Sequence, residues 1–139
     1  MEETLEIVLI KFDKIMQSAA YTCIVLGTEE KKFAIYTAAN NGKVMQNYLT
    51  STQTVRPLTH DLMNRVMQGL DIKLKQIVIN DLQDTVFFAR LFLEQQVGDM
   101  LHIVEIDARP SDCITLALLH RVPLYCTTEV LAKAVEYND

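Results

Sequence analysis

Hydrophobic and polar residues follow two different spacings along the chain, and together these predict most of its secondary structure. Short runs rich in branched and aromatic residues predict strands. They lie at Leu5–Phe12, Tyr21–Leu26, Phe33–Tyr36, Ile72–Ile79, Thr85–Leu93, Met100–Ile106 and Leu124–Cys126. Apolar residues three to four positions apart predict helices. They lie at Val44–Leu49, Leu62–Leu70, Pro110–Arg121 and Glu129–Tyr137.

The order of these segments predicts the fold class. The turn Gly27–Lys32 joins the second and third strands as a hairpin, and short turns at Asn80–Asp84 and Gln95–Asp99 join three later strands into an antiparallel meander. Strands and helices do not alternate strictly. We therefore expect an α+β fold, with a mixed, largely antiparallel sheet and helices packed around it, as a single domain over residues 1–139.

Composition limits the location and the partners of the chain. No apolar run reaches the roughly 20 residues that a membrane helix needs, and the acidic start Met1–Glu6 is unlike a signal peptide. We therefore expect a cytoplasmic protein with no membrane partner. Thirteen basic and eighteen acidic residues give a net charge of −5. This charge argues against tight, passive binding of duplex nucleic acid, but not against a nuclease, because a metal ion can supply positive charge.

The three cysteines do not indicate a metal or redox site. Cys23, Cys113 and Cys126 are far apart, lie among apolar neighbours and form no CxxC motif. This pattern predicts buried, reduced thiols.

Charged residues gather at two similar joints, each of which precedes a helix. One reads Arg56-Pro-Leu-Thr-His-Asp61, and the other reads Arg109-Pro-Ser-Asp112. Helix capping explains part of the pattern, because Thr59 can accept from free N–H groups, Pro110 suits a first helical position, and acids complement the positive helix end. For Thr59, Pro110, Ser111 and Asp112, capping and functional interpretations both stay open.

Capping does not explain Asp107, Arg109 or Arg56. Asp107 ends a predicted strand just before a helix begins, a place where exposed N–H groups receive anions. Arg90 lies between Phe88 and Phe92 on a predicted strand. A guanidinium in such surroundings needs an anionic partner. Asp107 or Asp112 is the expected partner, either in a structural ion pair or in a phosphate-binding site.

Three blocks of sequence resemble the bifunctional nuclease domain family. They are Arg56-Pro-Leu-Thr-His-Asp-Leu62, Val78-Ile-Asn-Asp-Leu82 followed by Thr85-Val-Phe-Phe-Ala-Arg-Leu91, and Ile106-Asp-Ala-Arg-Pro-Ser-Asp112. The resemblance implies a small α+β domain that often self-associates and acts on both RNA and DNA. One position departs from the family: an acidic residue that follows the third strand is replaced by asparagine, at Asn40 or Asn41. If that carboxylate binds metal, its loss weakens activity here.

Two hypotheses follow. In the first, the chain is a metal-assisted nuclease that hydrolyses phosphodiester bonds of RNA and DNA. Asp107 and Asp112 hold Mg²⁺ or Mn²⁺ through hard oxygen ligands, and no organic cofactor is expected. Arginines contact the phosphate, and His60 beside Asp61 positions water or a proton. The full expected site is His60, Asp61, Asp107 and Asp112 as catalytic residues, Arg56, Arg109 and Arg90 on phosphate, and Thr59 and Ser111 in support.

In the second hypothesis, the chain is a non-enzymatic oligomeric scaffold or a ligand-binding regulatory module. The same charges would then form an ion-pair network that fixes the strand-to-helix joint, and Arg109→Ala would sharply lower the melting temperature. Under either hypothesis, the apolar content and several short strands favour a homodimer or a higher homo-oligomer.

Overall fold

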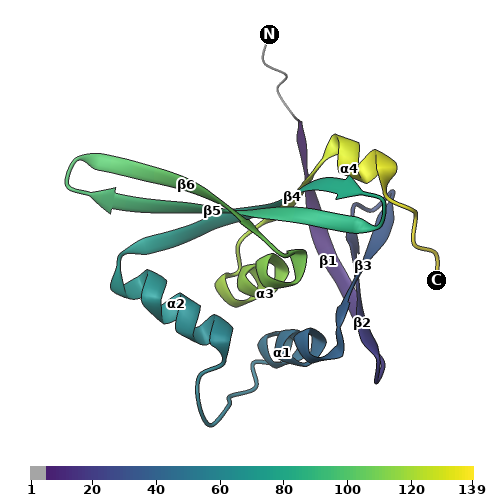
Figure 1. Ribbon diagram of the computed structural model, residues 1–139, viewed down its shortest axis with the longest axis horizontal. Coiled ribbons are helices and arrows are strands. Elements are labelled where there is room, and N and C mark those ends of the chain that lie inside the picture. Colours follow the sequence, from purple (N-terminus) through teal and green to yellow (C-terminus); the bar gives the residue numbers. More distant parts are fainter. Residues whose placement is uncertain (1–5) are drawn as a thin grey trace.

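A computed structural model describes residues 6–139 and confirms the α+β fold (Figure 1). The strands are β1 (Ile7–Gln17), β2 (Tyr21–Gly27), β3 (Lys32–Ala38), β4 (Ile72–Gln83), β5 (Val86–Val97), β6 (Met100–Ala108) and β7 (Leu124–Thr127). The helices are α1 (Ala39–Leu49), α2 (Thr59–Gly69), α3 (Pro110–His120) and α4 (Thr128–Lys133).

All of these strands belong to one sheet, in the order β3-β2-β1-β7-β4-β5-β6. The predicted β2–β3 hairpin and the β4–β5–β6 meander are both present and antiparallel. β7 lies between the two halves, antiparallel to β1 and parallel to β4, so the sheet is mixed. No helix in residues 6–139 has the length and apolar content needed to cross a membrane.

Helices cover the centre of the sheet on both faces. Ile77, Val78 and Ile79 are buried in succession on β4, as expected where both faces of a strand are covered. Figure 1 shows α1, α2 and α3 on one side of β4 and α4 on the other. Residues 113–117 of α3 are all buried, which places α3 at the core of the domain.

The sheet curves until its two halves approach each other. β3 is an edge strand, yet Phe33 on β3 stacks on Phe87 at the start of β5, with ring centroids 5.5 Å apart. This curvature brings the β3 edge close to the β4–β5 turn, although the two are distant in the strand order. The first turn of α3 lies beside them.

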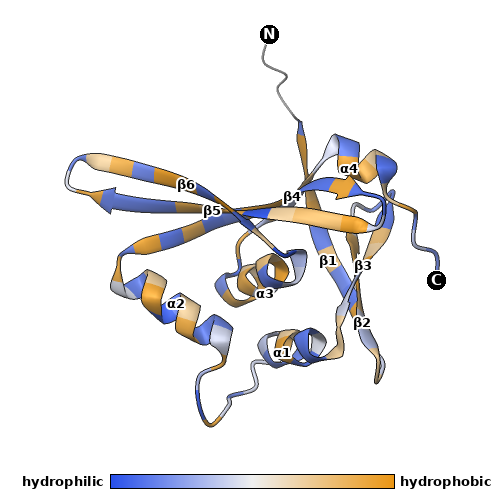
Figure 2. Ribbon diagram, viewed as in Figure 1, coloured by the Kyte–Doolittle hydropathy of each residue, from blue (hydrophilic) through white to orange (hydrophobic). Residues whose placement is uncertain are grey.

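The far ends of β5 and β6 form a projecting hairpin, which we call the arm (Figure 1). β6 is the other edge of the sheet, and its residues 100–107 are all exposed. Figure 2 shows strongly hydrophobic residues along this exposed strand. The exposed apolar side chains of β6 are Met100, Leu101, Ile103, Val104 and Ile106.

Several observed boundaries differ from the predicted ones. The predicted turn Asn80–Asp84 is mostly strand, because β4 continues to Gln83 through an irregularity between Ile79 and Asp81. α4 ends at Lys133 instead of Tyr137; the following segment turns toward β3, where the Tyr137 N–H donates to the Lys32 carbonyl at 2.7 Å. β1 extends to Gln17, beyond its predicted end, while Leu5 lies outside the described residues.

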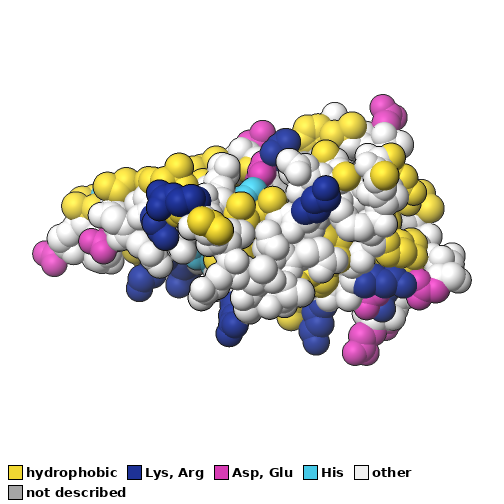
Figure 3. All heavy atoms as spheres, turned by 90° about the horizontal axis from the view of Figure 1, so that it is seen from below, with side chains coloured by type: hydrophobic (Ala, Val, Ile, Leu, Met, Phe, Trp, Pro, Cys, Tyr) yellow, Lys and Arg dark blue, Asp and Glu magenta, His cyan; other side chains and the backbone are white. Residues whose placement is uncertain are grey.

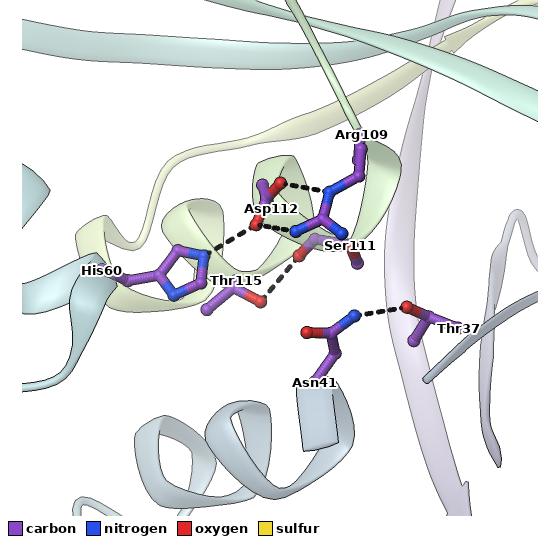
Figure 4. Close-up of polar contacts among 7 residues, drawn as sticks. All are labelled: Thr37, Asn41, His60, Arg109, Ser111, Asp112 and Thr115. Carbon is purple, nitrogen blue, oxygen red and sulfur yellow. Dashed lines mark hydrogen bonds and ion pairs between the residues drawn. The ribbon is translucent and has the colours of Figure 1, made fainter. Parts of the chain in front are cut away.

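α1 begins at Ala39, well before its predicted start, and packs closely against the sheet. A Cβ atom on Gly42 would lie 1.9 Å from the Gln17 side chain and 2.2 Å from the Thr22 hydroxyl oxygen. Glycine therefore permits this close approach, which the apolar periodicity of the helix did not indicate. The early start places Asn40 and Asn41 in the first turn of α1. Figure 4 shows Asn41 on the side of α1 that faces the start of α3.

Candidate functional site

The first turn of α3 holds the charged centre of the candidate site. Pro110 takes the first helical position as predicted, and the Arg109 carbonyl accepts from the Asp112 N–H at 3.0 Å. This turn brings the two charged side chains together. Asp112 accepts from Arg109 Nε at 2.8 Å and from Nη2 at 3.2 Å, as a two-point ion pair (Figure 4).

His60 joins this pair from the other Arg-Pro joint. It is the second residue of α2, and its Nε2 lies 3.1 Å from Asp112 Oδ1. Its side chain is 12% exposed, compared with 27% for Asp112 and 71% for Arg109. The Asp112 carboxylate accepts a hydrogen bond from the Nε2–H group of His60. In this tautomer Nδ1 is the ring nitrogen that can accept a proton. The predicted meeting of the two joints therefore occurs through His60, Asp112 and Arg109.

The contacts of Asp112 keep it ionised. Burial alone would raise the pKa of this carboxyl group, but hydrogen bonds from Arg109 and His60 outweigh burial, and the pKa lies below its ordinary value. The hydrogen bond to Asp112 likewise raises the pKa of Arg109. A fixed carboxylate that orients an imidazole is the arrangement that a general base requires.

Neutral polar groups extend the site toward α1. Asn41 donates from Nδ2 to the Thr37 hydroxyl at 2.7 Å, and Figure 4 shows its amide directed from α1 toward the start of α3. Ser111, predicted as a supporting residue, is buried beside it, and its carbonyl accepts from the Thr115 hydroxyl at 2.7 Å. Asn41, one of the two positions where the sequence suggested a missing acid, therefore faces the start of α3.

A pocket of about 730 Å³ opens beside Arg109, and we call it the β3–α3 pocket. It lies between the β3 edge, the β4–β5 turn, the start of α3 and the C-terminal segment, and its lining is mostly apolar. Tyr36, Thr37 and Phe87 contribute to its walls, and Arg109 and Ser111 lie at one side. No sequence pattern marked Tyr36 or Thr37 as site residues, because only the curvature of the sheet brings β3 to α3.

Three residues of the first joint lie outside the cluster. Asp61 accepts from the Leu58 N–H at 2.8 Å and from the Tyr48 hydroxyl at 2.9 Å, so it caps α2 and ties α2 to α1. Burial and this hydrogen bond raise the pKa of Tyr48. Thr59 does not act as the predicted cap, because Leu58 holds the cap position. Arg56 lines a separate hollow with Tyr48 and Asp61, so it does not join Arg109.

The prediction that Arg90 pairs with Asp107 or Asp112 is wrong. Arg90 lies opposite Asp107 in the β5–β6 register, but its guanidinium forms an ion pair with Glu105, at 3.8 Å. Glu105 lies two residues from Asp107 on the same face of β6, within reach of the long arginine side chain. Arg90 is 40% exposed, so a surface ion pair satisfies its charge there.

The described residues form no preformed binding site for a divalent metal ion. In residues 6–139, no group of three or more His, Cys, Asp or Glu side chains gathers closely enough to hold a metal. Asp112 already accepts from Arg109 and His60, and Asp107 is exposed on β6. These contacts do not fit a resident Mg²⁺ or Mn²⁺, which takes several oxygen ligands. The metal expected at Asp107 and Asp112 stays a prediction.

Comparisons with known proteins agree with the sequence blocks. The model of the bifunctional nuclease domain matches residues 24–138, more than half of the chain. Over 79 residues (57% of the chain), the sequence is 39% identical to an uncharacterized protein of Mycobacterium tuberculosis (Rv1829). Over 91 residues (66% of the chain), it is 26% and 28% identical to the proteins named bifunctional nuclease 1 and bifunctional nuclease 2 of Arabidopsis thaliana.

The matched stretches cover 44% of the mycobacterial protein and 26% of each plant protein, so the chain spans less than half the length of the relatives it matches. The family model itself covers both the His60–Asp112–Arg109 cluster and the β3–α3 pocket. The chain belongs to the bifunctional nuclease domain family.

Proposed function

We propose that this chain hydrolyses phosphodiester bonds of RNA and DNA, with the reacting phosphate held at the start of α3. The His60–Asp112–Arg109 cluster is the observation that carries the proposal. It combines a potential base, a carboxylate that orients the base, and a cation that is largely open to solvent. Family membership and the names of the plant relatives support a nuclease as the reaction class.

Arg109 is suited to hold the phosphate. Asp112 accepts from its Nε and Nη2, Nη1 has no acceptor among residues 6–139, and the side chain is 71% exposed. In the first turn of α3, Pro110 has no N–H and the Asp112 and Cys113 N–H groups donate to the Arg109 carbonyl, so the helix start adds only the positive end of its dipole beside Arg109. An arginine and a helix start together neutralise charge on a phosphate, and that charge grows in the transition state.

His60 takes the proton of the nucleophile. A neutral imidazole held by Asp112 removes a proton from a water molecule as the water oxygen bonds to phosphorus. The bond from phosphorus to the leaving nucleoside oxygen breaks, and that oxygen takes up a proton. In RNA the 2′-hydroxyl can replace the water as nucleophile, and DNA lacks this group. The same cluster would therefore be expected to cleave RNA faster than DNA.

A cleavage assay tests the proposal. Purified protein is incubated with labelled RNA and with single-stranded DNA, with Mg²⁺ or Mn²⁺ and separately with a chelator. We expect cleavage by wild type and a loss of about 10²–10⁴-fold in Asp112→Asn and His60→Gln. His102→Gln is the matched control, since His102 is exposed on β6 and outside the cluster. Equal cleavage by wild type and Asp112→Asn would reject the proposal.

The chelator reaction and one further variant test the metal prediction. If an ion binds only together with the substrate, Asp107 and Asp112 would be the carboxylates that hold it, and it would neutralise charge on the phosphate. Asp107→Asn would then lower cleavage only in the presence of metal. Cleavage that is unchanged by chelation and by Asp107→Asn would reject the metal and leave the His60–Asp112 chemistry in place.

A non-enzymatic module is the second candidate. The acidic net charge favours it, and so does the engagement of both Asp112 oxygens in contacts with His60 and Arg109. Under this reading the cluster fixes the α2–α3 joint, and the β3–α3 pocket holds a regulatory ligand. The two candidates differ most clearly in the effect that they predict for the removal of Arg109, on cleavage in the first and on stability in the second.

A further inference from the structure

We propose that the β3–α3 pocket receives one unstacked nucleoside of a single-stranded nucleic acid, while the adjoining phosphate lies on Arg109. This inference rests on the proposed function and adds the class of substrate. It starts from the position of the pocket, which adjoins the cluster through Arg109, Pro110 and Ser111. A strand held at Arg109 by a phosphate would therefore bring its neighbouring sugar and base to the pocket.

The size and lining of the pocket fit a nucleoside. Its volume of about 730 Å³ lies within the usual range for small-molecule sites, about 300–1,000 Å³. The walls are mostly apolar, which suits the faces of a base more than a free anion. Arg109 and Ser111 supply polar groups at the start of α3, where the phosphate would lie, and the other walls also carry polar residues, such as Thr37 on β3 and Thr85 at the β4–β5 turn.

Ser111 supplies a polar group for the bound sugar or phosphate. The residue is 6% exposed and lines the pocket. Its carbonyl accepts from Thr115, whereas its hydroxyl makes no hydrogen bond within the described part of the chain. Because Ser111 lines the pocket, its hydroxyl is available to donate to the sugar or phosphate of a ligand there.

Tyr36 and Phe87 supply aromatic surface. Phe87 is held in place by its stacking on the buried Phe33. Tyr36 is 64% exposed and meets Tyr21 edge-on, with ring centroids 5.5 Å apart. Stacking of a base on an aromatic side chain contributes about 1–3 kcal/mol. A base inside a duplex has both faces covered, so only an unpaired or extruded base can use these walls.

Because the molecule is acidic overall, we expect it to contact only a few phosphates of a nucleic acid, close to the pocket. The chain is acidic overall, and Asp84 and Glu136 line the same pocket. On the face shown in Figure 3, basic side chains stand in separate groups and form no continuous tract. Binding by one or two phosphates predicts a weak salt dependence, with a slope of log K against log salt of about −0.7 to −1.4.

The experiment compares three probes by calorimetric titration of the whole chain. The probes are uridine 5′-monophosphate, ribose 5-phosphate and inorganic phosphate. We expect the nucleotide to bind at least about fivefold more tightly than ribose 5-phosphate, since stacking contributes 1 kcal/mol or more. Equal affinity for these two probes would overturn the inference. A slope of log K against log salt steeper than about −4, measured for binding of a single strand, would also overturn it.

Two tyrosine variants separate stacking from general effects on β2 and β3. Tyr36→Ala should weaken nucleotide binding at least about fivefold and leave binding of ribose 5-phosphate unchanged. Tyr21→Ala is the matched control, because it removes the other ring of the pair, which does not line the pocket. Equal losses in the two variants, each with an unchanged melting temperature, would overturn the assignment of Tyr36.

The two proposals fail in different ways. Tight nucleotide binding without cleavage of RNA or DNA would reject the phosphodiesterase and leave the pocket assigned to a nucleotide. Cleavage together with equal affinity for uridine 5′-monophosphate and ribose 5-phosphate would reject the nucleoside pocket and leave the phosphodiesterase. Cleavage of duplex and single strands at equal rates would also count against the pocket, because its walls need an unstacked base.

Discussion

Replacing Arg109 by alanine separates a catalytic cluster from a purely structural one. The ion pair with Asp112 has good geometry, at 2.8 and 3.2 Å, but the arginine side chain is 71% exposed. Exposed ion pairs contribute about 0–1 kcal/mol. For a chain of 139 residues, 1 kcal/mol corresponds to about 3–4 °C in melting temperature. We therefore expect Arg109→Ala to lower the melting temperature by less than about 4 °C.

The effect on cleavage should be much larger. If Arg109 donates to the phosphate in the transition state, its loss should lower kcat/KM by about 10²–10³-fold. Thermal unfolding followed by circular dichroism gives the first quantity, and cleavage of labelled RNA well below the melting temperature gives the second. A large fall in activity with a small fall in stability is the expected result.

Lys133→Ala is the matched control for the removal of a surface cation. Lys133 pairs with Glu129 at 3.0 Å on α4, and both side chains are about half exposed. It should cost a similar small amount of stability and no activity. If Arg109→Ala instead lowered the melting temperature by more than about 10 °C, with activity falling only in step with the folded fraction, the cluster would be structural and the module hypothesis would stand.

Three further outcomes follow from the structure. The pKa of Asp112 is lowered in the folded state. Its stabilising contribution is therefore complete above the unfolded pKa near 3.9 and is lost as the pH falls through the folded pKa. The free energies of unfolding of wild type and Asp112→Asn, measured in urea, should converge in acid. Burial raises the pKa of Cys113 to about 12, and all three thiols are free and buried, as predicted; they should react with a disulfide reagent only after denaturation, and rapid reaction of the native protein would contradict this. We also propose that the exposed arm mediates the expected self-association, so that Ile103→Lys lowers the mass measured by analytical ultracentrifugation. Val55→Lys, at a fully exposed apolar position outside the arm, should not lower it. A wild type that is monomeric at every concentration would refute the proposal.

Local patterns predicted the local structure well. The β2–β3 hairpin, the β4–β5–β6 meander and the start of α3 at Pro110 each depend on residues close in sequence, and each was confirmed. The boundaries that were wrong depend on distant contacts. α4 stops at Lys133 because the segment after it turns toward β3, and periodicity within residues 129–137 carries no information about β3.

The sequence predicted the residue types of the site better than it predicted which side chains contact each other. Two Arg-Pro joints with similar spacing suggested a common centre, and His60 and Asp112 do meet, although 52 residues separate them. Which side chains meet depends on the angle between α2 and α3, which sequence spacing does not encode. For this reason Arg56 and Arg109 lie in separate hollows, and Arg90 pairs with Glu105.

The position of β7 sets the order in which the molecule can be completed. β1–β2–β3 and β4–β5–β6 are each hairpin-connected and can pair as soon as they are synthesised, but they share no direct strand pairing and are joined by residues 124–127. Until that short strand inserts, the β3 wall and the α3 wall of the pocket belong to halves that are linked by side-chain contacts such as Phe33–Phe87 and not by sheet pairing in the described residues. A nascent chain that has not yet reached β7 therefore lacks the assembled site, so binding competence would arise only at the last step of sheet formation.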